Sequence, residues 1–475
     1  MSNGLANLAP LKLACEWLEE PNLRFGRGGE HEDPTVGIPL YGPWSLGTAR
    51  HKSEVHIGII GTGAGIEKAV SFYNACAEGV DGDNSHAPFP GCRPDAGYRM
   101  ALRISDSHCE KITQAELGEV LAIRASRDRF LAGLELLKAK LRLLTERDHP
   151  LDYVAVVIPP ELRKRCGVAD YHERGVGPIH RDLRRAFKAA AMATKVPTQL
   201  LMEETLSLQV QERELDHLST RAWNLFNGLY FKVDGLPWGP TQQAPATCHV
   251  GVSFYRPLGS NSTLRTSLAQ AFDENGEGLI LRGHSFQWDE EKEGKTPHLT
   301  EELASRLIAL VLEKYDEVRG QLPRRVIIHK SSRYDPAERR GFLSALRQVD
   351  QSDLIALTPG SNVRLIRAGA YPPIRGTSFR AGDVTYLYTT GYLPSIGGFQ
   401  QGHVPSPLEL TDHIGDTAHP QLMREILALT KMNWNSARMY GLMPITLRFS
   451  RLVGDILREF TPELGEPSPK YKFYT

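Results

Sequence analysis

The chain has 475 residues, 41% of them hydrophobic and 24% charged, which is the balance of a soluble globular protein with two or three domains. Lys plus Arg and Asp plus Glu both number 56, so net charge gives no nucleic-acid signal, although a local basic groove remains compatible with it. The sequence shows no apolar run near the ~20 residues of a membrane span, no secretion signal and no CxxC pair among its six cysteines, so we expect a reduced cytoplasmic protein without a zinc site.

The first 50 residues are rich in Gly and Pro and predict an irregular segment laid across a domain surface. From about residue 51 to 215, apolar strands alternate with helical patterns, which indicates a doubly wound, Rossmann-like α/β domain. Strands are expected at 54–60, 98–104, 153–158 and 198–202, and helices at 66–78, 124–147 and 178–194.

A glycine-rich turn follows the first strand, with Gly61, Gly63 and Gly65 two residues apart. The third glycine of a GxGxxG fingerprint would fall on Ile66, and no acidic residue ends a clear strand about 20 residues later. A tight strand-to-helix turn is therefore the favoured interpretation, and a dinucleotide-binding α/β protein stays an alternative.

From about residue 216 the order of elements changes to three strands, a helix, a strand, a helix and a strand, which is the order of a ribonuclease-H-like fold. They are expected at 248–255, 262–272, 277–286, 300–319, 325–329, 336–349 and 353–357, with a turn at 273–276. Such a fold holds metal ions on carboxylates of its first and fourth strands, where this chain has Ser253 and Ser331. We therefore expect a protein that grips nucleic acid without cutting it.

A phosphate site is predicted where a helix meets a strand. Arg184 and Lys188 are four residues apart and share a helix face, Gln199 opens the next strand, and Lys232 ends a helical run at 221–231. Cations neutralise a phosphate, and the amide of Gln199 can support a terminal oxygen or a metal ion. The alternative is a solvated basic helix face.

Six separated strings carry a family resemblance. They are PNLRF at 21–25 with GIPLYGP at 37–43, the stretch 182–206, AWNLFNGLYFKVDGLPW at 222–238, LYTTGYLP at 387–394, VPSPL at 404–408, and MNWN at 432–435 with PIT at 444–446. In this order they resemble the argonaute family, specifically short prokaryotic argonautes. The resemblance implies a wrapping segment at 1–50, a MID domain at 51–215 and a PIWI domain at 216–475.

The resemblance also implies roles for individual residues. Lys188, Gln199 and Lys232 match positions that bind the 5′-phosphate of a guide strand, and Arg184 stands where relatives often carry Tyr or His. A magnesium ion at this phosphate would be held by Gln199 and by Thr475 at the carboxyl end. A docked hydrophobic terminus is the alternative role for that end.

The departures from the family imply a degenerate nuclease site. Active PIWI domains carry Asp at the positions of Ser253 and Ser331, and the last ligand would lie near Asn433 or Asn435. A hydroxyl cannot replace a carboxylate in a two-magnesium site, because hard divalent ions need anionic oxygen ligands there, and Asn is a poor substitute for Asp or His. We therefore expect no enzymatic activity from this chain. A nuclease with relocated carboxylates is the alternative, and the nearby acids are Asp335 and Glu277.

By the same resemblance, the chain is expected to use a guide RNA to find a complementary target DNA. It would act as the sensor of a heterodimeric defence system against phage or plasmids, working by abortive infection. A companion protein would supply the argonaute region that this chain lacks and an effector, either a sirtuin-like or TIR domain that depletes NAD, or a nuclease. Late arginines are expected to contact guide and target phosphates, and they are Arg364, Arg367, Arg375, Arg380, Arg438, Arg448 and Arg451.

Overall fold

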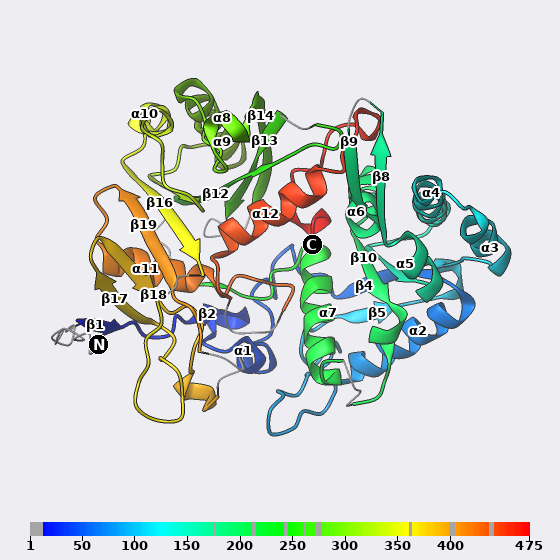
Figure 1. Ribbon diagram of the computed structural model, residues 1–475. Helices are drawn as coiled ribbons and strands as arrows, with labels where there is room; N and C mark the ends of the chain where they lie inside the picture. The colour runs from blue at the N-terminus through cyan, green and yellow to red at the C-terminus, as the bar shows by residue number, and fades with distance from the viewer. Residues whose placement is uncertain are drawn as a thin grey trace, which may run out of the picture.

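The computed structural model describes residues 13–174, 177–210, 215–241, 246–260, 263–271, 278–360, 363–398, 404–436 and 441–475. A five-stranded sheet and a nine-stranded sheet form the two halves of the molecule, and helix α7 (Leu218–Lys232) stands between them (Figure 1). The predicted turn at 273–276, and also Glu277 and Arg438, lie outside the described residues.

The five-stranded sheet belongs to the first half and is parallel throughout, with strand order β10-β7-β4-β5 and β6 paired with β4. Its strands are β4 (Glu54–Gly61), β5 (Ala101–Arg103), β6 (Cys109–Lys111), β7 (Tyr153–Ile158) and β10 (Thr198–Met202). The predicted α/β architecture of this half is confirmed.

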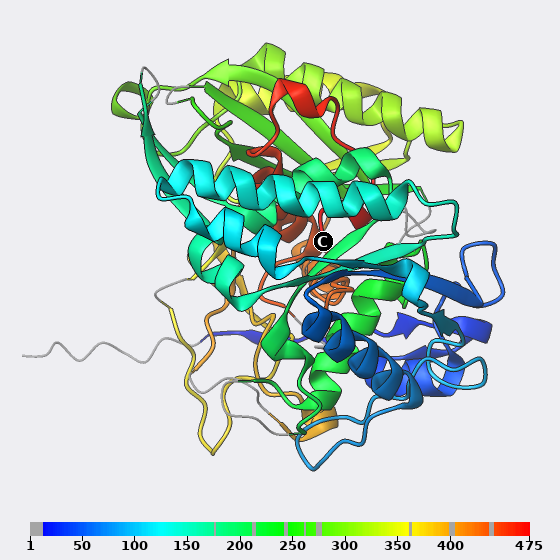
Figure 2. The same ribbon diagram turned by 90° about the vertical axis from the view of Figure 1, so that its right-hand side faces the viewer.

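Helices cover both faces of this sheet, because side chains of a strand alternate between its faces. Tyr153, Ala155 and Val157 of β7 pack in one core with α2 (Gly63–Glu78) and α7, whereas Val154 and Val156 pack in another with α4 (Ser126–Thr145). Figure 2 shows the blue α2 and the long cyan α4 on opposite sides of the sheet. The remaining helices that precede α7 in the chain are α1 (Pro34–Tyr41), α3 (Gln114–Ala122), α5 (Pro160–Cys166) and α6 (Leu183–Ala191).

The nine-stranded sheet has the order β1-β17-β18-β19-β16-β15-β12-β13-β14. Its strands are β1 (Cys15–Trp17), β12 (Thr247–Tyr255), β13 (Thr263–Ala271), β14 (Leu279–Gln287), β15 (Arg325–Lys330), β16 (Gln351–Pro359), β17 (Thr377–Ala381), β18 (Val384–Leu387) and β19 (Leu408–Ile414). Strands β12 to β14 are antiparallel neighbours, and β12, β15 and β16 run parallel. This is the order predicted for a ribonuclease-H-like fold.

Helices also cover both faces of the second sheet. The core on one face joins Val250 and Ile328 to α9 (Glu301–Arg319) and α10 (Pro336–Ala345). The core on the other face joins Ile327 to the last two helices. These are α11 (His419–Leu429) and α12 (Ile445–Leu457), and the short α8 (Glu290–Glu293) follows β14.

The amino-terminal segment runs along the second half and is more ordered than predicted. Strand β1 pairs with β17 at the edge of the large sheet, and β2 (Leu23–Arg24) pairs with β3 (Glu30–His31) and β11 (Gly239–Pro240). Helix α1 also lies here although it contains Pro39, because Asp33 caps it and Pro34 occupies its first position. The high proline content therefore predicted an irregular segment where the structure has short strands and a helix.

The helix predicted at 178–194 is wrong in its first turn. Residues Gly177–Asp182 form β9, which pairs with β8 (Val168–Glu173) as an antiparallel hairpin, and α6 begins only at Leu183. The cap explains the boundary, because the side chain of Asp182 accepts a hydrogen bond from the backbone N–H of Arg185 at 2.9 Å. Pro178 therefore lies in strand β9 and does not begin the helix.

Two ion pairs join α6 and its preceding strand to the end of the chain. Arg181 donates to Glu459 at 2.8 Å with both side chains largely buried, and Arg185 donates to Asp455 on α12 at 3.1 Å. Together they hold the carboxyl-terminal helix against the first half. No helix among the described residues has the length and apolar character needed to cross a membrane.

Candidate functional site

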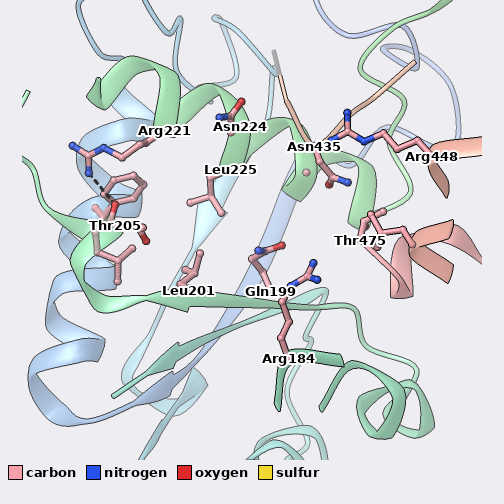
Figure 3. A pocket seen from close by; sticks show the side chains of 14 residues that line it. Arg184, Gln199, Leu201, Thr205, Arg221, Asn224, Leu225, Asn435, Arg448 and Thr475 are labelled. Atoms are coloured by element: carbon pink, nitrogen blue, oxygen red, sulfur yellow. Dashed lines mark hydrogen bonds between the residues drawn. The ribbon is translucent and has the colours of Figure 1, made fainter. Parts of the chain in front are cut away.

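A pocket of about 380 Å³ lies where strand β10, helix α7 and the carboxyl end meet (Figure 3). Three elements from different parts of the chain therefore surround one volume. Its lining residues are Phe72, Arg184, Gln199, Leu201, Thr205, Leu206, Arg221, Asn224, Leu225, Gly228, Asn435, Arg448, Leu452 and Thr475. Of the residues predicted to bind phosphate, Arg184 and Gln199 line the pocket directly.

Lys188 lies one turn beyond Arg184 on α6 but is buried, with 1% of its surface exposed. Its Nζ donates to the carbonyl oxygen of Thr198 at 2.8 Å and to the main-chain oxygen of Thr475. Burial, followed by the neighbouring cations Lys232 and Arg184, holds the pKa of Lys188 well below its usual range. The solvated basic helix face that was the alternative describes Arg184, which is exposed, and does not describe Lys188.

Lys232 reaches the same place from the last residue of α7. It is also 1% exposed, and its Nζ donates to Oε1 of Gln199. Burial, followed by the nearby charge of Arg184, lowers the pKa of Lys232 to about 7. The two lysines thus reach the floor of one site, from α6 and from α7, and each contacts a residue that lines the pocket.

The carboxyl end is a docked hydrophobic terminus that also reaches the pocket. Tyr471, Phe473 and Tyr474 are buried in the core shared with α7, and the hydroxyl of Tyr474 donates to the carbonyl oxygen of Ser468 at 2.8 Å. This packing places Thr475 against Lys188. Docking of the hydrophobic terminus is therefore compatible with a role for Thr475 as a ligand at the pocket.

The donor set of the pocket fits a hard cation beside a phosphate. Gln199 offers an amide oxygen and Thr475 a carboxyl oxygen, and Mg²⁺ prefers a few oxygen ligands completed by water and phosphate. Both protein oxygens accept hydrogen bonds from buried lysines, so a bound cation would share each oxygen with a lysine. When bound, the ion would neutralise charge between the Thr475 carboxylate and a phosphate.

Several lining residues were not predicted as parts of this site. Arg221 donates to four main-chain oxygens of the segment that follows β10, those of Thr205, Ser207, Gln209 and Asp216, and thereby shapes one wall. Asn224 lies one turn later on α7, and Arg448 enters from α12. Arg448 belongs to the late arginines singled out in the sequence, but nothing in the sequence places it opposite Gln199.

The two predicted degenerate positions on strands lie together. Val252 of β12 pairs with Lys330, the last residue of β15, so Ser253 and Ser331 each follow one member of the same pair. The hydroxyl of Ser253 is buried and has no hydrogen-bond partner among the described residues. Beside it, Lys330 forms a fully buried ion pair with Glu338 at 2.6 Å. Lys330 thus neutralises the acid that lies nearby.

Of the two acids proposed as relocated ligands, the one that the structure describes, Asp335, has a structural role. Asp335 caps α10 by accepting from the backbone N–H of Ala337 at 2.8 Å. Asn435, predicted at the last catalytic position, lines the pocket, and that lining includes neither Ser253 nor Ser331. The structure therefore brings two of the three predicted degenerate positions together and places the third at the pocket.

Arg375 corrects the expectation for the late arginines. It is 1% exposed, and its guanidinium donates to Glu20 at 2.8 Å, to Thr430 Oγ1 at 3.1 Å and to main-chain oxygens that include that of Leu427. A side chain enclosed in this way is not available to a nucleic acid. It fastens the amino-terminal segment to the second half instead.

The glycine-rich turn serves close packing. A Cβ at Gly61 or at Gly65 would lie 3.1 Å from side-chain atoms of Val157, whereas Thr62 caps α2 by accepting from Gly65 N at 3.1 Å. Strand β4 and helix α2 thus approach the neighbouring strand closely, which accounts for two glycines without a cofactor.

Comparison with known proteins identifies the fold. No protein-family model and no curated protein matches the sequence. Among solved structures, the chain is similar to Clostridium butyricum Argonaute bound to a guide DNA and a 19-mer target DNA, with a TM-score of 0.65 and 16% identity over 94% of this chain and 53% of that one. It is also similar to A. aeolicus Argonaute (TM-score 0.57, 15% identity, 96% and 54% covered) and to Drosophila Piwi (TM-score 0.55, 12% identity, 97% and 56% covered).

The chain therefore has the fold of argonaute and Piwi proteins, a mixed α/β fold with a Rossmann-like half followed by a ribonuclease-H-like half. It spans about half the length of the solved structures that it matches. At these identities the likeness is one of fold, and the predicted fold class is confirmed.

Proposed function

We propose that the chain is a short argonaute that binds a 5′-phosphorylated guide and recognises a complementary strand by base pairing. The observation that carries this proposal is the convergence of Lys188, Gln199 and Lys232 on one pocket at Thr475. Buried cations with lowered pKa values are stabilised when an anion arrives, which suits a terminal phosphate. Clostridium butyricum Argonaute, whose structure holds guide and target strands, shares the fold.

Sequence choice then rests in the guide, and the protein contacts backbone and duplex shape. A guide RNA paired with a target DNA is the pairing we propose, and contacts to the 2′-hydroxyl would distinguish RNA from DNA. A magnesium ion held by Gln199 and Thr475 would neutralise charge where the guide phosphate meets the carboxyl end.

Titration of the purified chain with labelled oligonucleotides tests this binding. Fluorescence anisotropy with 5′-phosphorylated RNA, the same RNA with a 5′-hydroxyl, and 5′-phosphorylated DNA should give the tightest binding for the first. Equal affinity for the phosphorylated and hydroxyl forms of the RNA would contradict the proposed phosphate pocket.

We further propose that target recognition produces a signal in place of cleavage. Ser253 on β12 and Ser331 just after β15 stand where carboxylates would be required, and Lys330 already neutralises Glu338. The output is a conformational change, which must draw on the difference in binding energy between the guide-only and guide–target states. A companion protein with an NAD-degrading domain or a nuclease would convert that change into defence against phage or plasmids.

The sensor role is tested in cells that express the chain with its candidate companion. Target plasmids should lower cellular NAD when both proteins are present, and Lys188→Met should prevent the loss. A guided nuclease with relocated carboxylates is the competing function, and the appearance of guide-directed cuts with Mg²⁺ or Mn²⁺ would favour it.

A further inference from the structure

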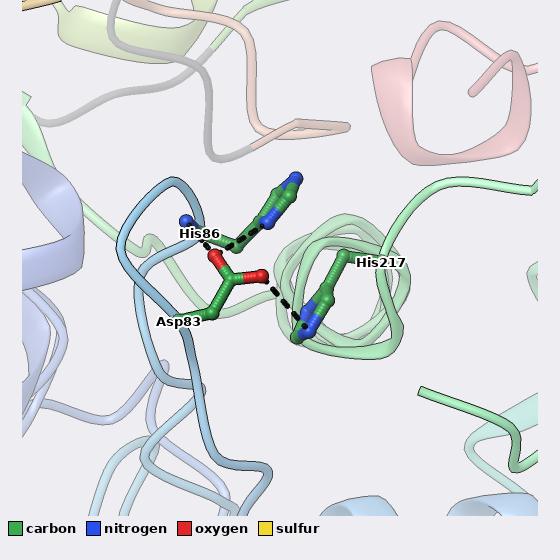
Figure 4. Close-up of side chains that lie close together, drawn as sticks. All are labelled: Asp83, His86 and His217. Carbon is green, nitrogen blue, oxygen red and sulfur yellow. Dashed lines mark hydrogen bonds and ion pairs between the residues drawn. The ribbon is translucent and has the colours of Figure 1, made fainter. Parts of the chain in front are cut away.

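A second cluster of ligand-type side chains lies beside the start of α7 and shares no residue with the lining of the pocket. Asp83 and His86 belong to the loop after α2, and His217 stands just before α7 (Figure 4). One ligand atom from each lies within 4.8 Å of the others, and no other group of three such residues does so within the described parts of the chain. Two imidazoles and a carboxylate match zinc, nickel, cobalt or copper better than magnesium or calcium.

We propose that Asp83, His86 and His217 bind one transition-metal dication of the zinc class, which fastens the loop at 81–88 to the start of α7.

The loop is held in place for this role by contacts that involve none of the three residues. Val80 and Phe89 close its base through paired backbone hydrogen bonds of 2.9 and 2.8 Å. Phe89 packs edge-on against Trp223 of α7 with ring centroids 5.2 Å apart, and the indole of Trp223 donates to the carbonyl oxygen of Pro88 at 3.1 Å. The loop therefore meets α7 in a fixed register, and the ligands start near one another without a metal ion.

Asp83 and His86 are paired by a tight turn. The backbone N–H of Asp83 donates to the carbonyl oxygen of His86 at 2.9 Å, and Nδ1 of His86 lies 2.8 Å from Oδ1 of Asp83. The second carboxylate oxygen, Oδ2, lies 3.7 Å from Nε2 of His217. Ligand atoms in a tetrahedral zinc site are roughly 3.4 Å apart, given bonds of about 2.0–2.2 Å, so these separations require only small adjustments.

Metal binding would also require one larger movement, the rotation of one imidazole ring. The rings of His86 and His217 are stacked, with centroids 4.5 Å apart and planes 6° from parallel. An imidazole nitrogen binds a metal ion in the plane of its ring, so two parallel rings cannot share an ion and one must turn. His86 is the ring that turns, because it sits on the partly exposed loop, whereas His217 is buried and caps α7.

His217 is suited to present Nε2. Its Nδ1 accepts a hydrogen bond from the backbone N–H of Ser219 at 3.2 Å and lies 2.8 Å from the Ser219 hydroxyl, which leaves Nε2 facing Asp83. Metal binding through Nε2 would move the ring proton to Nδ1, where the Ser219 hydroxyl can accept the hydrogen bond. Exposure of Asp83 leaves room for water as a fourth ligand. Because Arg221 follows one turn later and shapes the pocket wall, the ion would stabilise the start of the helix that carries Lys232 at its other end.

Metal binding by the full-length chain tests the proposal without any nucleic acid. After treatment with a chelator, the wild-type chain should take up one Zn²⁺ in equilibrium dialysis, and Co²⁺ at the same site should give the strong visible absorption of a tetrahedral complex. Asp83→Asn, His86→Ala and His217→Asn should each weaken Zn²⁺ binding at least about tenfold. Asn is a favoured N-cap residue, so His217→Asn keeps the cap of α7 while it removes the imidazole.

The matched control is His180→Ala. His180 contacts Asp170 at 2.7 Å in an exposed pair that belongs to no group of three ligand-type residues within the described parts of the chain, so this variant should bind Zn²⁺ like the wild type. The proposal fails if His86→Ala, which changes only a loop side chain, binds as much Zn²⁺ as the wild type, or if His180→Ala loses as much binding. Zn²⁺ should also raise the unfolding temperature of the wild type and leave that of His86→Ala unchanged.

Discussion

The ammonium group of Lys188 donates a hydrogen bond to the main-chain oxygen of Thr475, which lies 287 residues further along the chain. Both groups are buried, so this hydrogen bond ties the carboxyl end to the floor of the pocket. A phosphate that enters must share this lysine with a carboxylate. A bound cation removes the resulting repulsion, which is why the proposals for phosphate and for magnesium belong together.

Lys188→Met should weaken binding of a 5′-phosphorylated guide by about 1–3 kcal/mol, or roughly 5- to 150-fold, because a charge-assisted contact is lost. A guide with a 5′-hydroxyl should lose far less. Anisotropy titrations of both guides measure the difference. Lys164→Ala removes an exposed lysine of α5 in the same half and should leave both affinities unchanged. If Lys188→Met binds both guides like the wild type, the pocket has another ligand.

Guide affinity should fall as pH rises from about 7.5 to 9. The pKa of Lys232 is lowered to about 7 in the free protein, and a phosphate beside it raises that pKa, so binding takes up a proton above pH 7. Below pH 7 the lysine is charged in both states and adds no pH dependence. The phosphate itself titrates near pH 6 and does not interfere in this window. The affinity falls by at most tenfold per pH unit.

Lys232→Met should reduce this slope to the part that Lys188 contributes, because the pKa of Lys188 is also lowered, and a 5′-hydroxyl guide should show none. Titrations at several pH values in one buffer series check both expectations. An unchanged slope in the variant would assign the proton to a group other than Lys232.

Removal of magnesium should weaken binding of a phosphorylated guide and leave a hydroxyl guide unaffected. Gln199→Leu deletes one of the two proposed oxygen ligands while it keeps the shape of the strand residue, so its binding should respond less to chelation than the wild type. Titrations with and without EDTA provide the comparison. An equal response of the two guides would show that the ion acts on the duplex and not at the phosphate.

Guide, complementary target and Mg²⁺ or Mn²⁺ should give no cleaved product with the wild-type chain. Asp335→Ala should lower the free energy of unfolding by about 1 kcal/mol, because an N-cap of α10 is lost, and should not alter the gel. Guide-directed cleavage that disappears in this variant would instead give Asp335 a catalytic role.

Arg375→Ala should destabilise the chain by about 3–5 kcal/mol, because Glu20 and several buried oxygens lose their donor. Arg380→Ala, which changes a largely exposed arginine of β17, should cost about 0.5 kcal/mol or less. Urea denaturation measures both values. A stable Arg375→Ala variant with weakened guide binding would restore the role in nucleic-acid contact that its burial argues against.

Strong hydrophobic periodicity predicted most of the fold. Strand β7 spans the residues expected, and the order of β12 to β16 was readable because each apolar run ends at a turn or a helix cap. The hairpin of β8 and β9 was missed because its strands are polar on the exposed side and Pro178 resembles a helix start. The hydrophobic pattern of the sequence therefore predicted strands best where their side chains are most completely buried.

The pocket was predictable only in part. Lys188, Gln199 and Lys232 could be proposed from their spacing and from the resemblance, but Arg448 and Asn435 reach the pocket through packing between distant elements. The cluster of Asp83, His86 and His217 has no spacing signature, since 131 residues separate its two histidines along the sequence. The absence of a CxxC pair argues against a cysteine-based zinc site, but it says nothing about a cluster of histidine and aspartate.

The ion pair between Arg181 and Glu459 sets how freely the halves of the molecule can shift. Sliding α12 along the first half would separate two charges that water does not reach, at a cost of several kcal/mol. A rearrangement that keeps this pair closed would therefore move α12 and the first half together as one body.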